Sequence, residues 1–125
     1  MYKNATNITE KDINEIDFHE MGLDIGSKTL SLFENYLTNS KTVFWNGPLG
    51  VYEFPLYAES TDKLLKFLVT NNSKTVLGGG DIVAAASKLS LTDKFYHVST
   101  GGGATLEYLS GKNLPGLENI EEKGE

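Results

Sequence analysis

The chain has 125 residues, 39% of them hydrophobic and 22% charged, which suits one packed domain and is too apolar for an intrinsically disordered protein. Seventeen acidic against eleven basic side chains give a formal charge of −6, which argues against binding to nucleic acid or to an anionic membrane surface. The absence of cysteine excludes disulfides and thiolate metal sites, and without a long apolar run or a signal sequence the chain is expected to be cytoplasmic.

The first part of the chain has little pattern. Residues 1–20 are polar, and we interpret them as an N-terminal remnant rather than as the first element of a domain. Residues 21–27 predict a turn, in which Asp24 and Ser27 are candidate helix N-caps. An amphipathic helix is expected next, because apolar and aromatic side chains recur at helical spacing at Leu30, Phe33, Tyr36 and Leu37.

Three short runs of β-forming residues follow, without the polar alternation of a half-exposed strand. Such runs are typical of strands that are buried on both faces, as in a parallel sheet. The runs are residues 42–45, 75–77 and 95–98. Each is followed by a glycine-containing loop, at residues 46–50, 78–81 and 99–103, and each loop is followed by a helical pattern.

This alternation predicts an α/β fold: a parallel sheet of three to four strands with flanking helices, as in part of a Rossmann-like three-layer domain. The domain is assigned to residues 21–119, and residues 120–125 are expected to form a disordered tail. Because the carboxyl ends of parallel strands meet at one edge, the three loops should share a rim, where open α/β sheets bind ligands. An incomplete sheet should also leave an edge strand and an apolar face exposed, so association is expected.

The glycine loops favour a phosphate ligand. Two of them carry three consecutive glycines directly between a strand and a helix, which gathers backbone N–H donors at one point. Neither matches the dinucleotide-binding motif or the P-loop, because the third glycine of the former and the Gly-Lys-Ser/Thr of the latter are absent. Plain turn chemistry, which also needs glycine, is the alternative.

Single residues near these loops have both an ordinary and a functional interpretation. Asp81 is either the N-cap of a helix or a carboxylate for Mg²⁺ that bridges nucleotide phosphates. Glu53 is either a solvated acid or an acceptor for ribose hydroxyls. Ser99 and Thr100 either close a strand or add hydroxyls to an anion site, and a serine nucleophile is rejected because no base accompanies them. His97 is more typical of a core histidine than of a base.

Several segments, in their order and spacing, resemble phosphoglycerate kinase. They are residues 21–26, 45–53, 78–81 and 97–104, followed by 106–107, 111–112 and 114–116. The resemblance covers about residues 21–119 and implies the last part of the family's nucleotide-binding C-terminal domain. It implies a glycolytic phosphotransferase with a carboxyl-group acceptor, which moves a phosphoryl group between 1,3-bisphosphoglycerate and ADP to give 3-phosphoglycerate and ATP.

The resemblance also implies roles for single residues. Gly79 and Gly102 would be catalytic by offering amides to the phosphoryl group in transfer, Asp81 would bind the Mg²⁺ of ADP or ATP, and Glu53 would hold the ribose. The implied nucleotide-binding set is Gly22, Leu23, Asn46, Gly47, Pro48, Tyr52, Glu53, Gly79, Gly80, Asp81 and Ile82, and the phosphate loop is Thr100, Gly101, Gly102 and Gly103. Phosphoryl transfer needs positioning and charge stabilisation more than a covalent nucleophile, which agrees with a site rich in glycine amides.

Two departures from the family pattern shape the prediction. Ile82 stands where the family has Ser or Thr, whose hydroxyl contacts nucleotide phosphate, so we hypothesise weaker nucleotide binding; an Ile82→Thr chain that bound Mg-nucleotide no better would count against this. The N-terminal domain that binds phosphoglycerate and the lysines that neutralise the phosphoryl group are missing. We therefore expect an inactive C-terminal fragment, which meets 3-phosphoglycerate only when the missing domain is supplied. A non-catalytic α/β module and a complementing subunit of a split enzyme are the alternatives.

Overall fold

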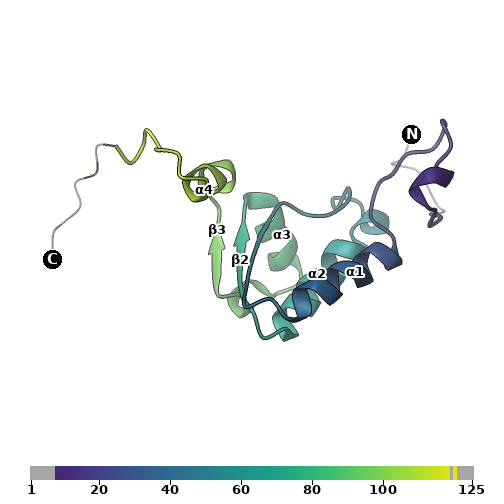
Figure 1. Ribbon diagram of the computed structural model, residues 1–125, viewed down its shortest axis with the longest axis horizontal. Helices are drawn as coiled ribbons and strands as arrows, with labels where there is room; N and C mark the ends of the chain where they lie inside the picture. The colour runs from purple at the N-terminus through teal and green to yellow at the C-terminus, as the bar shows by residue number, and fades with distance from the viewer. Residues whose placement is uncertain (1–7, 119, 121–125) are drawn as a thin grey trace.

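The centre of the molecule is a three-stranded parallel sheet, seen in a computed structural model that describes residues 8–118 and 120 (Figure 1). Its strands are β1 (Thr42–Asn46), β2 (Lys74–Gly78) and β3 (His97–Ser99), in the order β1-β2-β3. Both strand pairs are parallel, so the predicted sheet is confirmed. The third strand begins two residues later than expected, at His97, although the Tyr96 amide already donates to the Thr75 carbonyl at 3.0 Å.

Four α-helices accompany the sheet. They are α1 (Ser27–Thr38), α2 (Glu59–Thr70), α3 (Gly80–Lys88) and α4 (Gly102–Leu109), and short 3₁₀ turns lie at η2 (Ile13–Glu15), η3 (Pro55–Tyr57) and η4 (Thr92–Lys94). The α/β alternation therefore follows the predicted order. Alanines at positions 84–86 give α3 a narrow face, which lets it lie close to β2 and β3.

The hydrophobic core lies between one face of the sheet and the helices. Side chains alternate along each strand, so Val43 of β1 and Leu77 of β2 point into the core, where Leu65 of α2 and Ile82 of α3 are fully buried. Helix α2 contacts α1 on one side and α3 on the other, as Figure 1 shows. Burial of one such Leu or Ile side chain stabilises the fold by about 1.5–3 kcal/mol. The sheet and the helices on this face are thus two of the three predicted layers.

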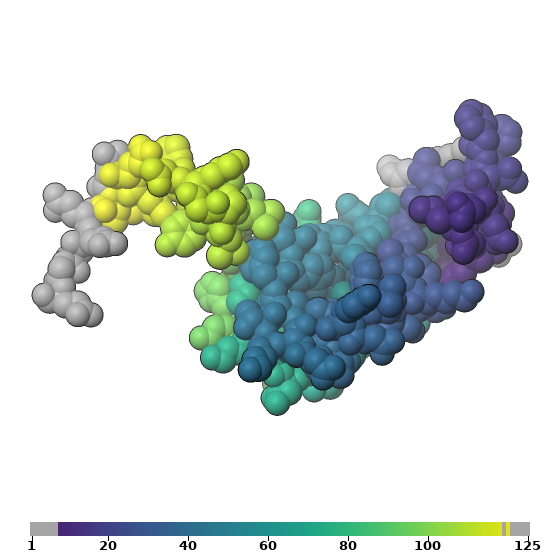
Figure 2. Space-filling view, viewed as in Figure 1, coloured from purple at the N-terminus to yellow at the C-terminus, as the bar shows by residue number. Residues whose placement is uncertain are grey.

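The end of the chain stands out from this body. No residue of α4 is buried, and Leu106, Tyr108 and Leu109 are exposed. Figure 2 shows α4 and residues 110–118 projecting from the rest of the molecule. The expected disordered tail lies, except for residue 120, outside the described residues. Among the described residues, no helix is both long enough and apolar enough to cross a bilayer.

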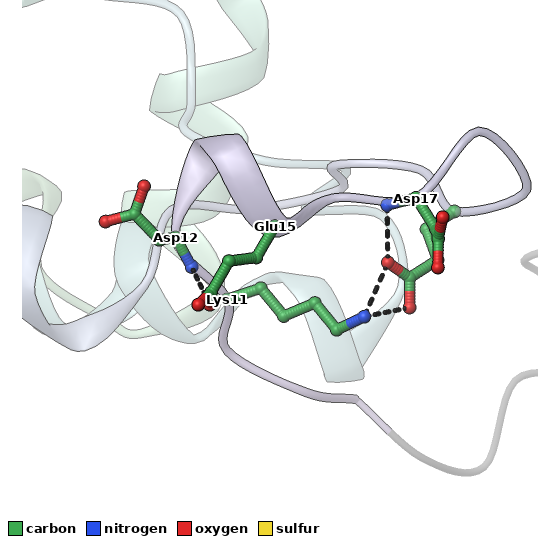
Figure 3. A network of polar contacts seen from close by, with 5 residues as sticks. Lys11, Asp12, Glu15 and Asp17 are labelled. Atoms are coloured by element: carbon green, nitrogen blue, oxygen red, sulfur yellow. Dashed lines mark hydrogen bonds and ion pairs between the residues drawn. The ribbon is translucent and has the colours of Figure 1, made fainter.

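Polar contacts order the segment before α1, although none of its residues from 8 to 20 is buried. Lys11 reaches both carboxylate oxygens of Glu20 at 2.6 and 2.7 Å, and the same carboxylate accepts the Asp17 amide at 2.9 Å (Figure 3). Asp12 and Glu15 form a capping box around η2. The segment predicted to be a weakly patterned remnant therefore has local structure, held by surface charges rather than by apolar packing.

Candidate functional site

The carboxyl ends of the three strands meet at one rim. Asn46 at the end of β1 pairs with Gly78 at the end of β2, and Gly78 pairs with Ser99 at the end of β3. The ladder extends one residue beyond the strands, because Gly47 N–H donates to the Gly78 carbonyl at 3.3 Å and Gly79 N–H donates to the Ser99 carbonyl at 2.8 Å. The expectation that the three loops share a rim is confirmed.

Two glycines let these loops come close. Gly79 has φ +100° and Gly102 has φ +48°, in the left-handed region that side chains disfavour. A β-carbon built on Gly79 would lie 3.7 Å from the Gly102 α-carbon, and one on Gly102 would lie 3.8 Å from the Gly79 α-carbon. A single added β-carbon on either glycine would therefore already touch the facing loop, so the loops after β2 and β3 approach one another backbone to backbone.

The free amides of the rim belong to the first turns of α3 and α4. Gly79, expected to offer its amide to a phosphoryl group, instead donates it to Ser99, so this N–H is already engaged. Helix α3 starts at Gly80, and the first amides of a helix have no acceptor within it. The donors available after β2 are accordingly those of Gly80, Asp81 and Ile82. At the start of α4 they are those of Gly102 and Gly103.

The loop after β3 is held by its own hydroxyls. Ser99 Oγ lies 2.9 Å from Thr105 Oγ1 and accepts the Gly101 amide at 3.2 Å. A β-carbon on Gly101 would lie 2.6 Å from Thr105 Oγ1, so glycine is required there. Ser99 therefore shapes the loop with internal contacts, while Thr100 is exposed beside it.

Asp81 and Ile82 follow one another but point to different places. Asp81 is exposed in the first turn of α3, where its carboxylate is accessible from the rim. Ile82 is fully buried in the core cluster with Leu77 and Ala86. The Ile82 side chain therefore packs in the core, and the hypothesis that Ile82 weakens nucleotide binding stays a prediction. Because the first turn of a helix turns one side chain outward and the next toward the sheet, only the Ile82 backbone belongs to the rim.

The residues expected around adenosine come from two separate stretches that the fold brings together. Leu23, next to Gly22, accepts the Val51 amide at 2.9 Å, which joins the turn before α1 to the loop after β1. Tyr52 is half-buried on the edge of the core, and Glu53 beside it is exposed. Burial first, and then the nearby charges of Asp81 and Glu53, raise the pKa of the Tyr52 phenol. The Tyr52 ring thus lies within electrostatic reach of the Asp81 carboxylate.

Two supporting residues of this loop escaped prediction from the sequence. Thr61 of α2 is fully buried and bonds to both backbone groups of Leu49, which lies between Pro48 and Gly50. Asp24 was considered as a cap for the helix that follows it, but its carboxylate accepts the amide and the hydroxyl of Ser60 in the first turn of α2. Both are contacts between distant segments, so no local pattern could have indicated them.

The electrostatics of the rim are those of backbone dipoles and carboxylates. Among the described residues there is no group of three or more His, Asp or Glu side chains that could hold a metal by themselves. The chain contains no arginine, because its eleven basic residues are all lysines. The residues named at the rim include no lysine, and the carboxylates that act on Tyr52 there are Asp81 and Glu53.

The phosphoglycerate kinase family model matches residues 1–112. The chain belongs to the phosphoglycerate kinase family. The match begins at residue 1, so it includes the segment before residue 21, where the individual motifs showed no resemblance.

Individual phosphoglycerate kinases agree with this assignment. The enzyme of Fusobacterium nucleatum is 46% identical over 123 residues, which are 98% of this chain and 31% of that protein. The enzyme of Borrelia hermsii is 50% identical over 111 residues, or 89% of this chain and 28% of that protein. The chain therefore spans less than a third of the length of these relatives.

Solved phosphoglycerate kinases share the fold. The Coxiella burnetii structure superposes with a TM-score of 0.77 at 35% identity, over 82% of this chain and 26% of that one. The Pyrococcus horikoshii structure gives 0.71 at 34% identity, over 79% of this chain and 24% of that one. The α/β fold with its parallel sheet is therefore that of the corresponding part of a phosphoglycerate kinase.

Proposed function

We propose that this chain is the ADP/ATP-binding part of a phosphoglycerate kinase, which holds Mg-nucleotide for phosphoryl transfer between 1,3-bisphosphoglycerate and ADP. The observation that carries the proposal is the meeting of the three loops at one rim, where Asn46 is hydrogen-bonded to Gly102 and the backbones of Gly79 and Gly102 face one another. Membership of the phosphoglycerate kinase family supports a phosphotransferase, and the carboxyl-group acceptor is part of the proposal. The rim supplies the position where a nucleotide phosphate would lie.

Nucleotide phosphates would bind at the first turn of α3. The amides of Gly80, Asp81 and Ile82 lie at the positive end of the helix dipole, which favours an anion. Gly102 and Gly103 would add amides from the facing loop. In place of Gly79, whose amide is engaged by Ser99, these donors would stabilise the phosphoryl group in transfer.

A Mg²⁺ ion suits this donor set. Mg²⁺ keeps several waters and is commonly held by one or two carboxylates together with substrate phosphates. Asp81 offers one exposed carboxylate at the rim, and the lack of a larger acidic cluster among the described residues fits an ion that arrives with its nucleotide. When bound, the ion would neutralise phosphate charge, while Asp81 would orient it.

The adenosine would lie against the loop between β1 and η3. Gly47, Pro48 and Tyr52 would contact the base side, with Gly22 and Leu23 opposite, since the Val51–Leu23 hydrogen bond joins these stretches. Glu53, exposed next to Tyr52, would accept ribose hydroxyls. Thr61 and Asp24, which hold this loop and the neighbouring turn, would keep the two sides of the pocket in register.

Calorimetric titration of the 125-residue chain with Mg-ADP tests nucleotide binding. Saturable binding is expected, and Asp81→Asn should weaken it when Mg²⁺ is present but have less effect with ADP and no metal. Asp93→Asn, which removes another exposed carboxylate near the opposite end of the sheet, is the matched control. A silent titration of a folded chain would contradict the proposal and support the non-catalytic module instead.

Turnover is a separate question. Phosphoryl transfer needs the developing charge to be neutralised, and the described rim carries no lysine or arginine among its nucleotide and phosphate residues. We therefore expect the purified chain to bind nucleotide without forming ATP from 1,3-bisphosphoglycerate. Measurable turnover by the purified chain in a coupled assay would overturn this expectation.

Association through the sheet remains a prediction with one supporting observation. The outer edge of β1 has no strand beside it among the described residues. An apolar groove of about 200 Å³ adjoins it, lined by Phe33, Leu37, Val43, Phe44, Trp45, Leu49, Leu64 and Leu68. Such an edge is a template for pairing with a chain that supplies further strands. Sedimentation of the chain as a clean monomer at high concentration would contradict association with itself.

A further inference from the structure

One side chain spans the rim. Asn46 is the last residue of β1, and its Nδ2 donates to the Gly102 carbonyl at 3.4 Å, across the end of β2. The bond joins residues 56 positions apart in the sequence. Besides the backbone ladder, it is therefore a direct link from the first glycine loop of the rim to the third.

Gly78 and Gly79 leave room for the Asn46 side chain. A β-carbon on Gly78, the residue paired with Asn46, would lie 3.1 Å from Asn46 Nδ2 and 2.7 Å from the Phe44 ring. A β-carbon on Gly79 would lie 3.5 Å from the same Nδ2. The carboxamide thus lies over a strand end that has no side chains, and it can reach the facing loop because nothing stands between them.

The Asn46 hydrogen bond is made to a peptide group whose N–H, that of Gly103, is a candidate donor to phosphate. The Gly102 carbonyl and the Gly103 amide belong to one trans peptide, in which C=O and N–H point in opposite directions. Gly102 opens α4, so its carbonyl already lies along the helix, and the Asn46 bond adds a hold from β1 on the same peptide and hence on the direction of the Gly103 N–H. Another side-chain anchor of this end of α4 is the Ser99 hydroxyl, which holds Thr105 and the Gly101 amide, and no residue of α4 is buried.

We propose that Asn46 is a positioning residue, which sets the orientation of the Gly103 amide for a phosphate group by holding the Gly102 carbonyl. The role rests on the proposed function, because it serves a phosphate at the rim. It is distinct from any direct contact between Asn46 and a nucleotide, since it acts on the loop before a ligand arrives.

The apo chain tests the positioning role by amide NMR. Asn46→Ala should move the Gly102 and Gly103 amide resonances and leave those of α2 unchanged. Asn72→Ala, which deletes an exposed carboxamide at the opposite end of β2, should leave both glycines unmoved. If Asn46→Ala moves neither glycine, or moves them no more than Asn72→Ala does, the proposal is wrong.

Asn46→Asp adds a readout that a merely structural role would not show. The variant has the same shape, so it keeps the test open should Asn46→Ala fail to fold. An ionised carboxylate cannot donate to the Gly102 carbonyl, whereas the protonated acid can. The Gly103 resonance of Asn46→Asp should therefore be displaced at neutral pH and return toward the wild-type position as the new carboxyl is protonated. A resonance that follows the wild-type titration throughout would overturn the proposal.

Titration with inorganic phosphate, followed on the Gly103 amide, separates this proposal from the proposed function. Because the Asn46 bond already exists without ligand, Asn46→Ala should weaken phosphate binding only by the cost of orienting the Gly103 amide, at most the roughly tenfold that one net hydrogen bond is worth. If wild type fails to bind phosphate but the apo spectra respond as expected, the positioning role stands and the phosphate site is wrong. Equal phosphate affinity in wild type and Asn46→Ala would instead contradict the role of the bond in binding.

Discussion

Thr61 holds Leu49 by both of its backbone polar groups. The Thr61 hydroxyl donates to the Leu49 carbonyl and accepts from the Leu49 amide, each at 2.8 Å, and Thr61 is fully buried. Leu49 lies in the loop after β1, whereas Thr61 belongs to α2. The core helix thereby determines the shape of a loop that the proposed nucleotide pocket uses.

Thr61→Val should destabilise the chain by about 1–3 kcal/mol, because it keeps the shape of the side chain but leaves two partly buried backbone groups without a partner. Urea unfolding followed by circular dichroism measures the change. Thr70→Val is the matched control, since its hydroxyl donates to the Phe67 carbonyl at an exposed position. Equal unfolding midpoints for the two variants would show that the Thr61 contact is energetically unimportant.

Ile82→Thr should destabilise the chain without improving nucleotide binding, because position 82 is fully buried and the new hydroxyl would enter the core. Ile82→Val removes a similar volume without a hydroxyl and should cost about 0.5–1.5 kcal/mol. The Thr variant is expected to be the less stable of the two in urea unfolding. Tighter Mg-ADP binding by Ile82→Thr would support the hypothesis that this hydroxyl contacts phosphate.

Glu10 should lose its contact with α1 in acid. The Ser27 hydroxyl donates to Glu10 Oε2 at 2.7 Å, and this bond, followed by one from the Ser27 amide, lowers the Glu10 pKa from 4.5. A lowered carboxyl pKa means that the contact contributes fully above the unfolded value of 4.5 and is lost as the pH falls through the lower, folded value.

Carboxyl NMR on Ser27→Ala measures this effect. The Glu10 pKa should rise toward its ordinary value, because the largest cause of its depression is removed. Ser31→Ala, an exposed serine one turn further along α1, should leave the Glu10 pKa unchanged. Matching Glu10 titrations in wild type and Ser27→Ala would mean that the two side chains do not interact in solution.

Asp81→Asn should lower the Tyr52 pKa. The Asp81 charge is one of the two that raise it, after burial, so part of the elevation should persist in the variant. NMR of labelled tyrosine separates the Tyr52 phenol from the other tyrosines. Mg²⁺ binding at Asp81 should also lower the Tyr52 pKa in wild type, because the ion neutralises the carboxylate. A Tyr52 titration insensitive to Asp81→Asn would place the two side chains further apart than described.

The sequence was sufficient for the sheet because its signals are local. Runs such as residues 42–45 and 75–77 lack polar alternation, and each is followed within two residues by glycine, which is typical of the end of a strand. The shared rim then follows from a general rule of parallel sheets, whereas the strand order β1-β2-β3 was not predicted and comes from the structure. Helix α2 begins at Glu59, after a 3₁₀ turn that starts at Pro55.

The site was less predictable because its details depend on partners distant in the sequence. The Gly79 amide donates to the carbonyl of Ser99, which lies twenty positions further along the chain. Nothing in the run of glycines indicates this hydrogen bond. The motif around Ile82 indicated a nucleotide-binding position. Its burial depends instead on the packing of α3 against the sheet. Asp24 was considered as a local cap, although it stabilises α2 instead. The roles of the nucleotide-binding residues remain predictions.

The exposed position of α4 has a consequence for how the molecule opens. Its residues are unburied, and β3, which leads into it, spans only His97–Ser99. Helix α4 can therefore unfold locally as a separate cooperative unit while the core around Leu65 and Leu77 stays folded. The loop at residues 99–103 connects these two units. A ligand that bridges Gly80 and Gly103 would reduce the conformational entropy of this loop, so ligand binding and ordering of the loop would be a single event.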